Sequence, residues 1–129
     1  MNPPTILLVD DDDGVRRILR KLLEAQSYCV LENGFPQAAC EVFDANPAAV
    51  DLLVTDLKMP GMSGQDLAAH VWAARPEMRV LFISGYTDSS YTETLNGSRS
   101  RFLEKPFASE LLLKHVAELL AGRRELPSS

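Results

Sequence analysis

The stretch Ile6-Leu7-Leu8-Val9-Asp10-Asp11 joins four apolar residues directly to two carboxylates. A short apolar run of this kind is typical of a buried strand, and the charges then stand at the strand's end. The arrangement returns three more times, since later strand-like segments end on Asp56, Ser84 and Lys105. In a parallel α/β sheet all these residues would meet at one carboxyl edge, which is where ligands bind in such folds.

Segments with helical spacing of apolar residues alternate with the strand-like runs. We expect strands at about 5–10, 28–32, 51–56, 79–84 and 101–105. We expect helices at about 13–26, 36–43, 63–74, 87–97 and 108–121. The helix over 87–97 is the weakest, because it has few apolar residues and poor helix formers. Five strands that alternate with five helices predict a doubly wound α/β fold with a five-stranded parallel sheet.

The composition indicates one soluble globular domain. The chain has 129 residues and a formal net charge of -5, which gives no electrostatic support to nucleic-acid binding. We expect a single domain over 1–129, with a core from about 5 to 121, a last helix ended by Gly122 and a disordered tail over 123–129. No apolar run reaches the ~20 residues of a membrane span, and the amino terminus does not resemble a signal peptide. We therefore expect a cytoplasmic protein, with Cys29 and Cys40 as buried free thiols.

The four strand ends suit the transfer of a phosphoryl group to a carboxylate. Asp10, Asp11 and Asp56 would repel one another in a partly desolvated cleft, and a bound divalent cation would relieve that repulsion. Magnesium is the natural candidate, with manganese as a substitute, because it takes hard oxygen ligands and bridges carboxylates to phosphate oxygens. Ser84 could donate a hydrogen bond to one phosphoryl oxygen, and Lys105 could pair with another.

Each of these residues also has an ordinary structural explanation when it is taken alone. The pair Asp10-Asp11 is compatible with a solvated helix start that Asp12 or Asp13 caps. Lys105 could be a surface lysine, and Ser84 a loop or cap residue. The functional interpretation depends on all four positions occurring at the same end of their strands.

From Thr5 to about Ala121 the chain resembles the receiver domains of response regulators in two-component signalling. The first strand and its acidic pair resemble the family's first motif. The stretch Asp51-Leu52-Leu53-Val54-Thr55-Asp56-Leu57-Lys58-Met59-Pro60-Gly61-Met62-Ser63-Gly64 resembles the phosphoacceptor strand and the loop after it. Phe82-Ile83-Ser84-Gly85 and Phe102-Leu103-Glu104-Lys105-Pro106-Phe107 resemble the hydroxyl and lysine strands.

The resemblance implies a role for each site residue. Asp56 would be the phosphorylated residue and also a metal ligand, and Asp11 would bind magnesium directly. Asp10 would help, often through water, and the backbone carbonyl of Lys58 would be a further ligand. The family also implies a flavodoxin-like strand order of 2-1-3-4-5, and it often has a cis peptide at the position of Lys105-Pro106.

The resemblance also implies a signalling domain and its partners. The domain would catalyse only its own phosphorylation and dephosphorylation, with a histidine kinase or a histidine phosphotransfer protein as donor. A fused kinase or a downstream effector would be its partner, without direct nucleic-acid contact. A homodimer would form through the fourth helix, fifth strand and fifth helix. The stretches Ile83-Ser84-Gly85-Tyr86-Thr87-Asp88 and 102–107 are most similar to receivers of hybrid histidine kinases.

Three departures from the common family pattern concern the switch. Ser84 stands where many receivers have threonine, so the hydroxyl is kept without the methyl that limits its rotamers. Phe102 replaces a frequent tyrosine, which predicts a weaker or differently read switch. Lys58 and Tyr86 stand where the family tunes the access of water, and a bulky Tyr86 would slow hydrolysis of the acyl phosphate.

Two other functions compete with this interpretation. Asp11-x-Asp13-Gly14-Val15 resembles the nucleophile motif of haloacid-dehalogenase-like phosphohydrolases, but no later acidic pair follows Lys105 on a strand. A degenerate receiver that binds partners without phosphorylation is the second alternative. This alternative leaves unexplained why the acidic residues, Ser84 and Lys105 are all present.

Overall fold

The fold is a five-stranded parallel sheet between two layers of helices. The structure, a computed structural model, describes residues 3–85 and 99–125, with side chains described up to 121. The strands are β1 (Thr5–Val9), β2 (Cys29–Asn33), β3 (Leu52–Asp56), β4 (Arg79–Ser84) and β5 (Ser100–Glu104). They pair in the order β2-β1-β3-β4-β5, which confirms the order expected from the family resemblance.

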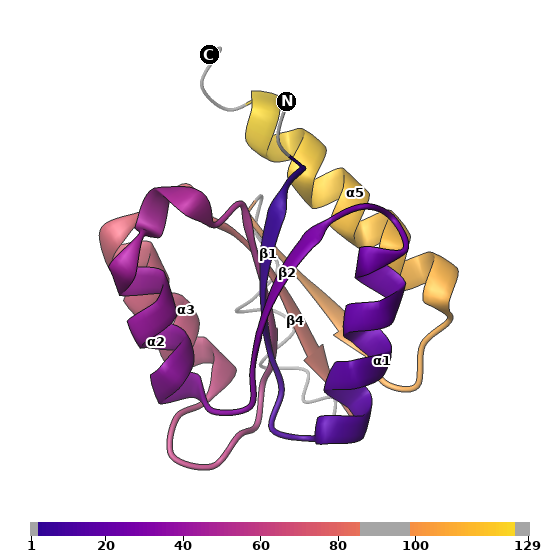
Figure 1. Ribbon diagram of the computed structural model, residues 1–129, viewed down its shortest axis with the longest axis horizontal. Helices are drawn as coiled ribbons and strands as arrows, with labels where there is room; N and C mark the ends of the chain where they lie inside the picture. The colour runs from indigo at the N-terminus through magenta and orange to yellow at the C-terminus, as the bar shows by residue number, and fades with distance from the viewer. Residues whose placement is uncertain (1–2, 86–98, 126–129) are drawn as a thin grey trace.

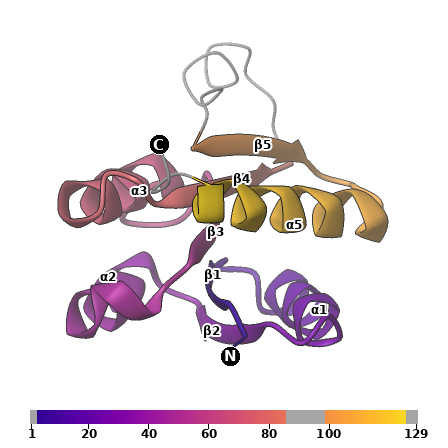
Figure 2. The same cartoon turned by 90° about the horizontal axis from the view of Figure 1, so that it is seen from above.

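Helices cover both faces of the sheet, as Figures 1 and 2 show. On one face lie α2 (Pro36–Ala45) and α3 (Gly64–Ala74), and on the other lie α1 (Asp13–Glu24) and α5 (Ser109–Glu125). A 3-10 turn, η1 (Pro47–Ala49), precedes β3. The expected helix over 87–97 lies outside the described residues, so four α-helices are seen in the described part of the chain.

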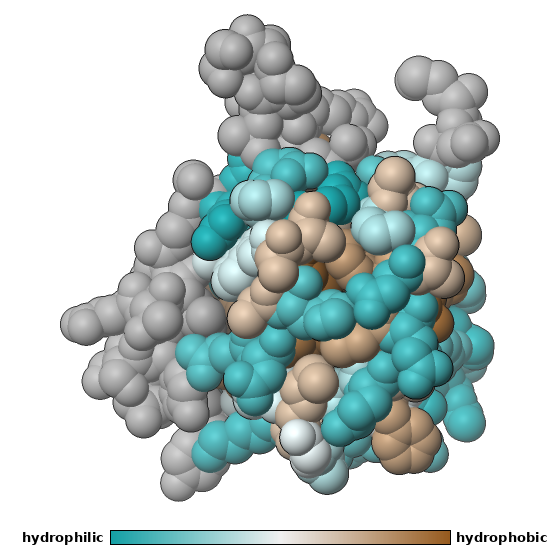
Figure 3. Space-filling model, turned by 90° about the vertical axis from the view of Figure 1, so that its left-hand side faces the viewer, coloured by the Kyte–Doolittle hydropathy of each residue, from teal (hydrophilic) through white to brown (hydrophobic). Residues whose placement is uncertain are grey.

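Alternation along the strands builds two hydrophobic cores. Leu7, Val9 and Phe82 point to the α2–α3 side, and Ile6, Leu8 and Ile83 point to the α1–α5 side. This period of two is what a strand requires when both its faces are covered. Figure 3 shows the face that α2 and α3 cover, where hydrophilic residues surround a central strip of apolar ones.

The helix ends follow local sequence signals. Asp12 caps α1 by accepting from the Val15 amide at 3.1 Å, and Ser63 with Asp66 forms a capping box at α3. Gly122 does not end the last helix, contrary to the sequence prediction, because α5 continues to Glu125. One glycine costs a helix only about 1 kcal/mol, and good helix formers, Arg123, Arg124 and Glu125, follow it.

Three further points of the sequence prediction concern the thiols, the Lys105-Pro106 peptide and membrane insertion. Cys40 is buried, but Cys29 is exposed, because β2 is an edge strand and Cys29 is its first residue. The Lys105-Pro106 peptide is cis. Within the described ranges, no helix has the length and apolar character needed to cross a membrane.

Candidate functional site

The predicted site residues meet at the carboxyl edge of the sheet, which is the lower edge in Figure 1. Asp10 directly follows β1, and Asp56 is the last residue of β3. Ser84 ends β4 and is 2% exposed, and Lys105 follows β5. The Lys105 amide donates to the Ser84 carbonyl at 2.8 Å, which joins the last two strand ends. The predicted convergence of the four strand ends is therefore confirmed for the backbone.

Three carboxylates form a tight cluster at this edge. Asp10, Asp11 and Asp56 each offer one oxygen, and these oxygens lie within 4.8 Å of one another. Asp10 is 1% exposed, the Asp56 side chain is 13% exposed, and Asp11 is exposed. The Lys105 ammonium lies 3.3 Å from Asp10 Oδ2 and 3.5 Å from Asp56 Oδ2. The Lys105 ammonium therefore pairs with two of the three carboxylates.

The charge balance of this cluster fits a divalent cation. Three carboxylates and one ammonium leave two negative charges, and the donors are the hard oxygens that magnesium prefers. Burial raises the pKa of the Asp56 carboxyl, and the nearby Asp10 carboxylate adds to this rise. The Lys105 ammonium and the amides of Lys58 and Leu57 oppose the rise in pKa without cancelling it. Additional positive charge near Asp56 would therefore be stabilising.

The turn after β3 holds Asp56 against the start of α3. The Gly64 amide donates to the Leu57 carbonyl at 2.8 Å, and the Thr55 hydroxyl donates to the Asp56 carbonyl at 3.0 Å. An ideal Cβ on Gly64 would lie only 2.1 Å from the Asp56 carbonyl oxygen. The first turn of α3 can approach β3 this closely because residue 64 has no side chain.

The loop after β1 is held by its own carboxylates. The Asp12 amide donates to Asp10 Oδ1 at 2.9 Å, and the Asp10 amide donates to the Asn33 carbonyl of β2 at 3.3 Å. Arg16 reaches back from α1, and its Nη1 donates to the Asp10 carbonyl at 2.7 Å. The sequence prediction did not include Arg16. The spacing of Asp13 and Arg16 on a helix was a signal for an ion pair, although not for the contact with Asp10.

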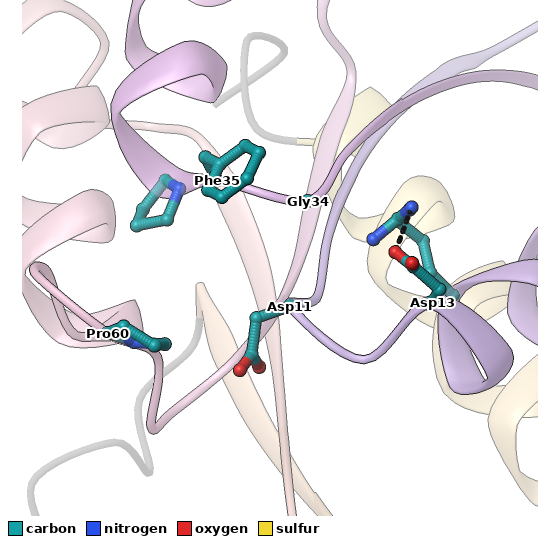
Figure 4. A pocket seen from close by; sticks show the side chains of 7 residues that line it. Asp11, Asp13, Gly34, Phe35 and Pro60 are labelled. Atoms are coloured by element: carbon teal, nitrogen blue, oxygen red, sulfur yellow. Dashed lines mark hydrogen bonds and ion pairs between the residues drawn. The ribbon is translucent and has the colours of Figure 1, made fainter.

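A cleft of about 430 Å³ opens beside the acidic cluster. Asp11, Gly34, Phe35 and Pro60 line this cleft, and Figure 4 shows the Asp11 carboxylate pointing away from Phe35 and Gly34, with Pro60 to one side. Phe35 is 72% exposed, so the mouth of the cleft carries an aromatic ring at the surface. The cluster is therefore accessible from solvent on the side of Asp11.

The remaining predicted residues take different positions. Lys58 is exposed in the loop after β3, and its predicted role as a carbonyl ligand stays a prediction. Phe102 is partly buried and packs against the core on the α2–α3 side. Tyr86 lies outside the described residues. Asp13 is not one of the three clustered carboxylates, since its Oδ1 pairs with Arg16 at 2.7 Å. The described residues therefore give no support to the phosphohydrolase alternative.

Comparisons with known proteins give one consistent result. The sequence model of the response regulator receiver domain matches residues 6–117. The sensor kinase CckA of Brucella abortus is 32% identical over 117 residues, which are 90% of this chain and 12% of the kinase. The receiver protein CpdR of the same organism is 32% identical over 116 residues, which are 89% of this chain and 95% of that protein. The crystal structure of the receiver domain from the hybrid histidine kinase CckA superimposes with a TM-score of 0.77 at 33% identity, covering 90% of this chain and 98% of that one.

Proposed function

The chain belongs to the response regulator receiver domain family, and we propose that it accepts a phosphoryl group on Asp56 in a two-component phosphorelay. The observation that carries this proposal is the environment of Asp56. Its carboxylate is mostly buried, lies within reach of two other carboxylates and faces the Lys105 ammonium. The same chemistry follows from the residue types and from the family.

Asp56 is the best nucleophile of the three carboxylates. Asp10 is almost fully buried, and one of its oxygens is already engaged by the Asp12 amide. Asp11 is exposed, and the Lys105 ion pairs run to Asp10 and Asp56. Asp56 combines partial access with a raised pKa, so its charge is less satisfied than that of an ordinary surface aspartate. Bonding to an incoming phosphorus atom would spread the negative charge of this oxygen and thereby stabilise it.

The transfer needs little covalent help from the protein. An Asp56 oxygen attacks phosphorus, and the phosphorus–nitrogen bond of the donor phosphohistidine breaks with its electron pair left on the imidazole nitrogen. Lys105, now 3.5 Å from Asp56 Oδ2, would pair with a phosphoryl oxygen, and the Ser84 hydroxyl would donate to another. A magnesium or manganese ion on Asp11, Asp56 and the Lys58 carbonyl, with Asp10 acting through water, would supply the charge neutralisation that this transfer requires.

The response to phosphorylation would start at the fourth and fifth strands. Ser84 would move towards the phosphoryl group, and Phe102 would be repositioned beside it. Their strands are paired in register, with Phe82 opposite Phe102 and Ser84 opposite Glu104. A local charge change would thus bias the surface formed by β5, α5 and the segment between β4 and β5. Because Phe102 lacks a hydroxyl, its new position would form no side-chain hydrogen bond, and only its packing would change.

The partners follow from this role. We propose a histidine kinase or a histidine phosphotransfer protein as donor, and a fused kinase or a separate effector as the reader of the phosphorylated state. The domain would act in the cytoplasm and would catalyse only its own phosphorylation and dephosphorylation. A homodimer through the fourth helix, β5 and α5 stays a prediction, because the fourth helix lies outside the described residues.

The proposal is tested by phosphorylation with a small donor. The protein is incubated with acetyl phosphate and magnesium, and its intact mass is measured. We expect one added phosphoryl group in the wild type and none in Asp56→Asn. Asp51→Asn is the matched control, because Asp51 lies at the opposite end of the same strand and accepts from the Thr5 amide at 2.8 Å. Unmodified wild type would support the phosphorylation-independent alternative, and a modified Asp56→Asn would exclude Asp56 as the acceptor.

A further inference from the structure

Arg16 connects three parts of the molecule around the acidic cluster. Its Nε donates to Glu32 Oε1 of β2 at 2.9 Å, and its Nη2 donates to Asp13 Oδ1 at 2.7 Å. Its Nη1 donates to the backbone carbonyl of Asp10 at 2.7 Å. The Arg16 side chain is only 16% exposed. Three of the guanidinium's donors are therefore used in fixed directions, each on a different element.

The contact with the Asp10 carbonyl matters because Asp11 belongs to the same peptide group. The Asp10 carbonyl belongs to the peptide bond that leads into Asp11, so its direction fixes the plane of that peptide. Within the described part of the chain, no hydrogen bond or ion pair is found to the Asp11 carboxylate itself. The direction of the Asp11 side chain in Figure 4 thus depends on the backbone that carries it.

We propose that Arg16 is a positioning residue that holds the Asp10–Asp11 peptide and thereby aims the Asp11 carboxylate at the acidic cluster. This inference rests on the proposed function, because it assigns Arg16 the task of setting the affinity of that cluster for a divalent cation. Arg16 touches neither the cation nor the phosphoryl group in this scheme. It acts through the ligand, as outer-shell partners of metal ligands do.

The surroundings of Arg16 are suited to this task. Glu32 accepts from both Arg16 and Arg20, and the hydrogen bond from Arg16 is the main reason that the pKa of Glu32 is lowered. The planar fork of arginine can serve all three acceptors together, whereas the single ammonium of lysine cannot reproduce its directions. A Cβ on Gly34 would lie 2.8 Å from Arg16 Nη1, so residue 34 leaves the space that the guanidinium occupies.

Arg20 provides a matched control. Its Nη1 pairs with Glu32 Oε2 at 2.5 Å, so Arg16→Gln and Arg20→Gln each remove one arginine from Glu32 and change the net charge equally. Only Arg16→Gln removes the bond to the Asp10 carbonyl. The affinity for magnesium is measured by calorimetric titration of the full chain. Hydrogen exchange of the amides in residues 10–13 is measured in the metal-free protein.

We expect Arg16→Gln to weaken magnesium binding about 10-fold and Arg20→Gln to stay within about twofold of the wild type. Arg16→Lys keeps the positive charge and serves as the second variant if Arg16→Gln does not fold. Its magnesium affinity should lie between those of the wild type and Arg16→Gln. Exchange of the 10–13 amides should accelerate in Arg16→Gln more than in Arg20→Gln.

Two results would overturn the inference. One is an unchanged magnesium affinity in both Arg16 variants, and the other is an equal loss in Arg16→Gln and Arg20→Gln, which would indicate only a general ion-pair effect. A wild type that binds no magnesium would instead defeat the metal role in the proposed function. In that case, equal exchange rates in the two glutamine variants would also reject the positioning role, and faster exchange in Arg16→Gln alone would support it.

Discussion

Substitution of Gly64 by alanine should disturb the close packing of the start of α3 on the end of β3, where Asp56 lies. The new Cβ would lie 2.1 Å from the Asp56 carbonyl oxygen and 3.1 Å from Leu57 Cα. Since real Cβ contacts below 3.0 Å are essentially absent, the helix and strand would have to separate by about 0.9 Å. Both close atoms belong to backbone, so no side chain can rotate away to make room.

The size of the effect follows from three contributions. Overpacking of a tight contact costs about 1–3 kcal/mol, and a contact with rigid backbone belongs at the upper end. Separation also weakens the 2.8 Å bond from the Gly64 amide to Leu57, which is worth about 1 kcal/mol. The better helix propensity of alanine returns about 0.5–1 kcal/mol. The free energy of unfolding should therefore fall by about 3 kcal/mol, which for a chain of this size lowers Tm by roughly 10 °C.

The assay is urea unfolding followed by tryptophan fluorescence. Trp72 is the one tryptophan of the chain, lies in α3 and donates from its indole to the Met78 carbonyl at 2.8 Å, so it reports on this helix directly. Gly14→Ala is the control, since Gly14 lies in the first turn of α1 and its Cβ would meet only Asp12 Oδ1, at 3.4 Å. A Gly64→Ala protein as stable as the wild type, or as Gly14→Ala, would refute the reasoning.

Four further predictions can each be tested by one measurement. Without metal at neutral pH, Asp56→Asn should raise the urea midpoint, because the pKa of Asp56 is raised in the folded protein and its ionised form weakens the fold. This gain in stability should vanish below the unfolded pKa of about 4. Excess magnesium should stabilise the wild type more than the variant. Glu32→Gln should lower stability at pH 7, and the difference from the wild type should shrink as pH falls below about 4.5, because a lowered carboxyl pKa gives stability that is lost on protonation; a difference independent of pH would contradict this. Phe102→Tyr should enlarge the change in hydrogen exchange of β5 that beryllium fluoride, a phosphoryl mimic, produces with magnesium, whereas an identical change in both proteins would reject the importance of the missing hydroxyl. Tyr86→Ala should shorten the lifetime of the phosphorylated protein, and equal dephosphorylation rates would remove the proposed shielding by Tyr86.

The residues of the candidate site could be predicted to lie together because strand ends are local features of the sequence that the sheet brings to one edge. Each of Asp10, Asp56, Ser84 and Lys105 directly ends or follows an apolar run, and a parallel sheet brings such ends together whatever the details of packing. The side-chain periodicity of the strands was equally readable, since it depends only on alternation. Both features can be predicted without knowing any distance between residues that are far apart in the sequence.

Features that depend on tertiary contacts could not be predicted in this way. Arg16 looks like one more charge on a helix, and only the packing of α1 beside β2 brings it to Glu32 and to the Asp10 carbonyl. Gly64 looks like a residue of the capping sequence, although its main constraint is the carbonyl of Asp56. Cys29 was expected to be buried, yet it is exposed at the start of an edge strand, which its apolar neighbours do not reveal.

The identity of the phosphorylated residue decides whether Asp56 is the phosphoacceptor. The protein is phosphorylated by a phosphohistidine donor with magnesium, reduced with borohydride to convert an aspartyl phosphate into homoserine, digested, and sequenced by mass spectrometry. We expect homoserine at position 56 and aspartate at positions 10 and 11. Homoserine at either of those two positions, or unmodified aspartate at position 56 in a protein that carries phosphate, would contradict it.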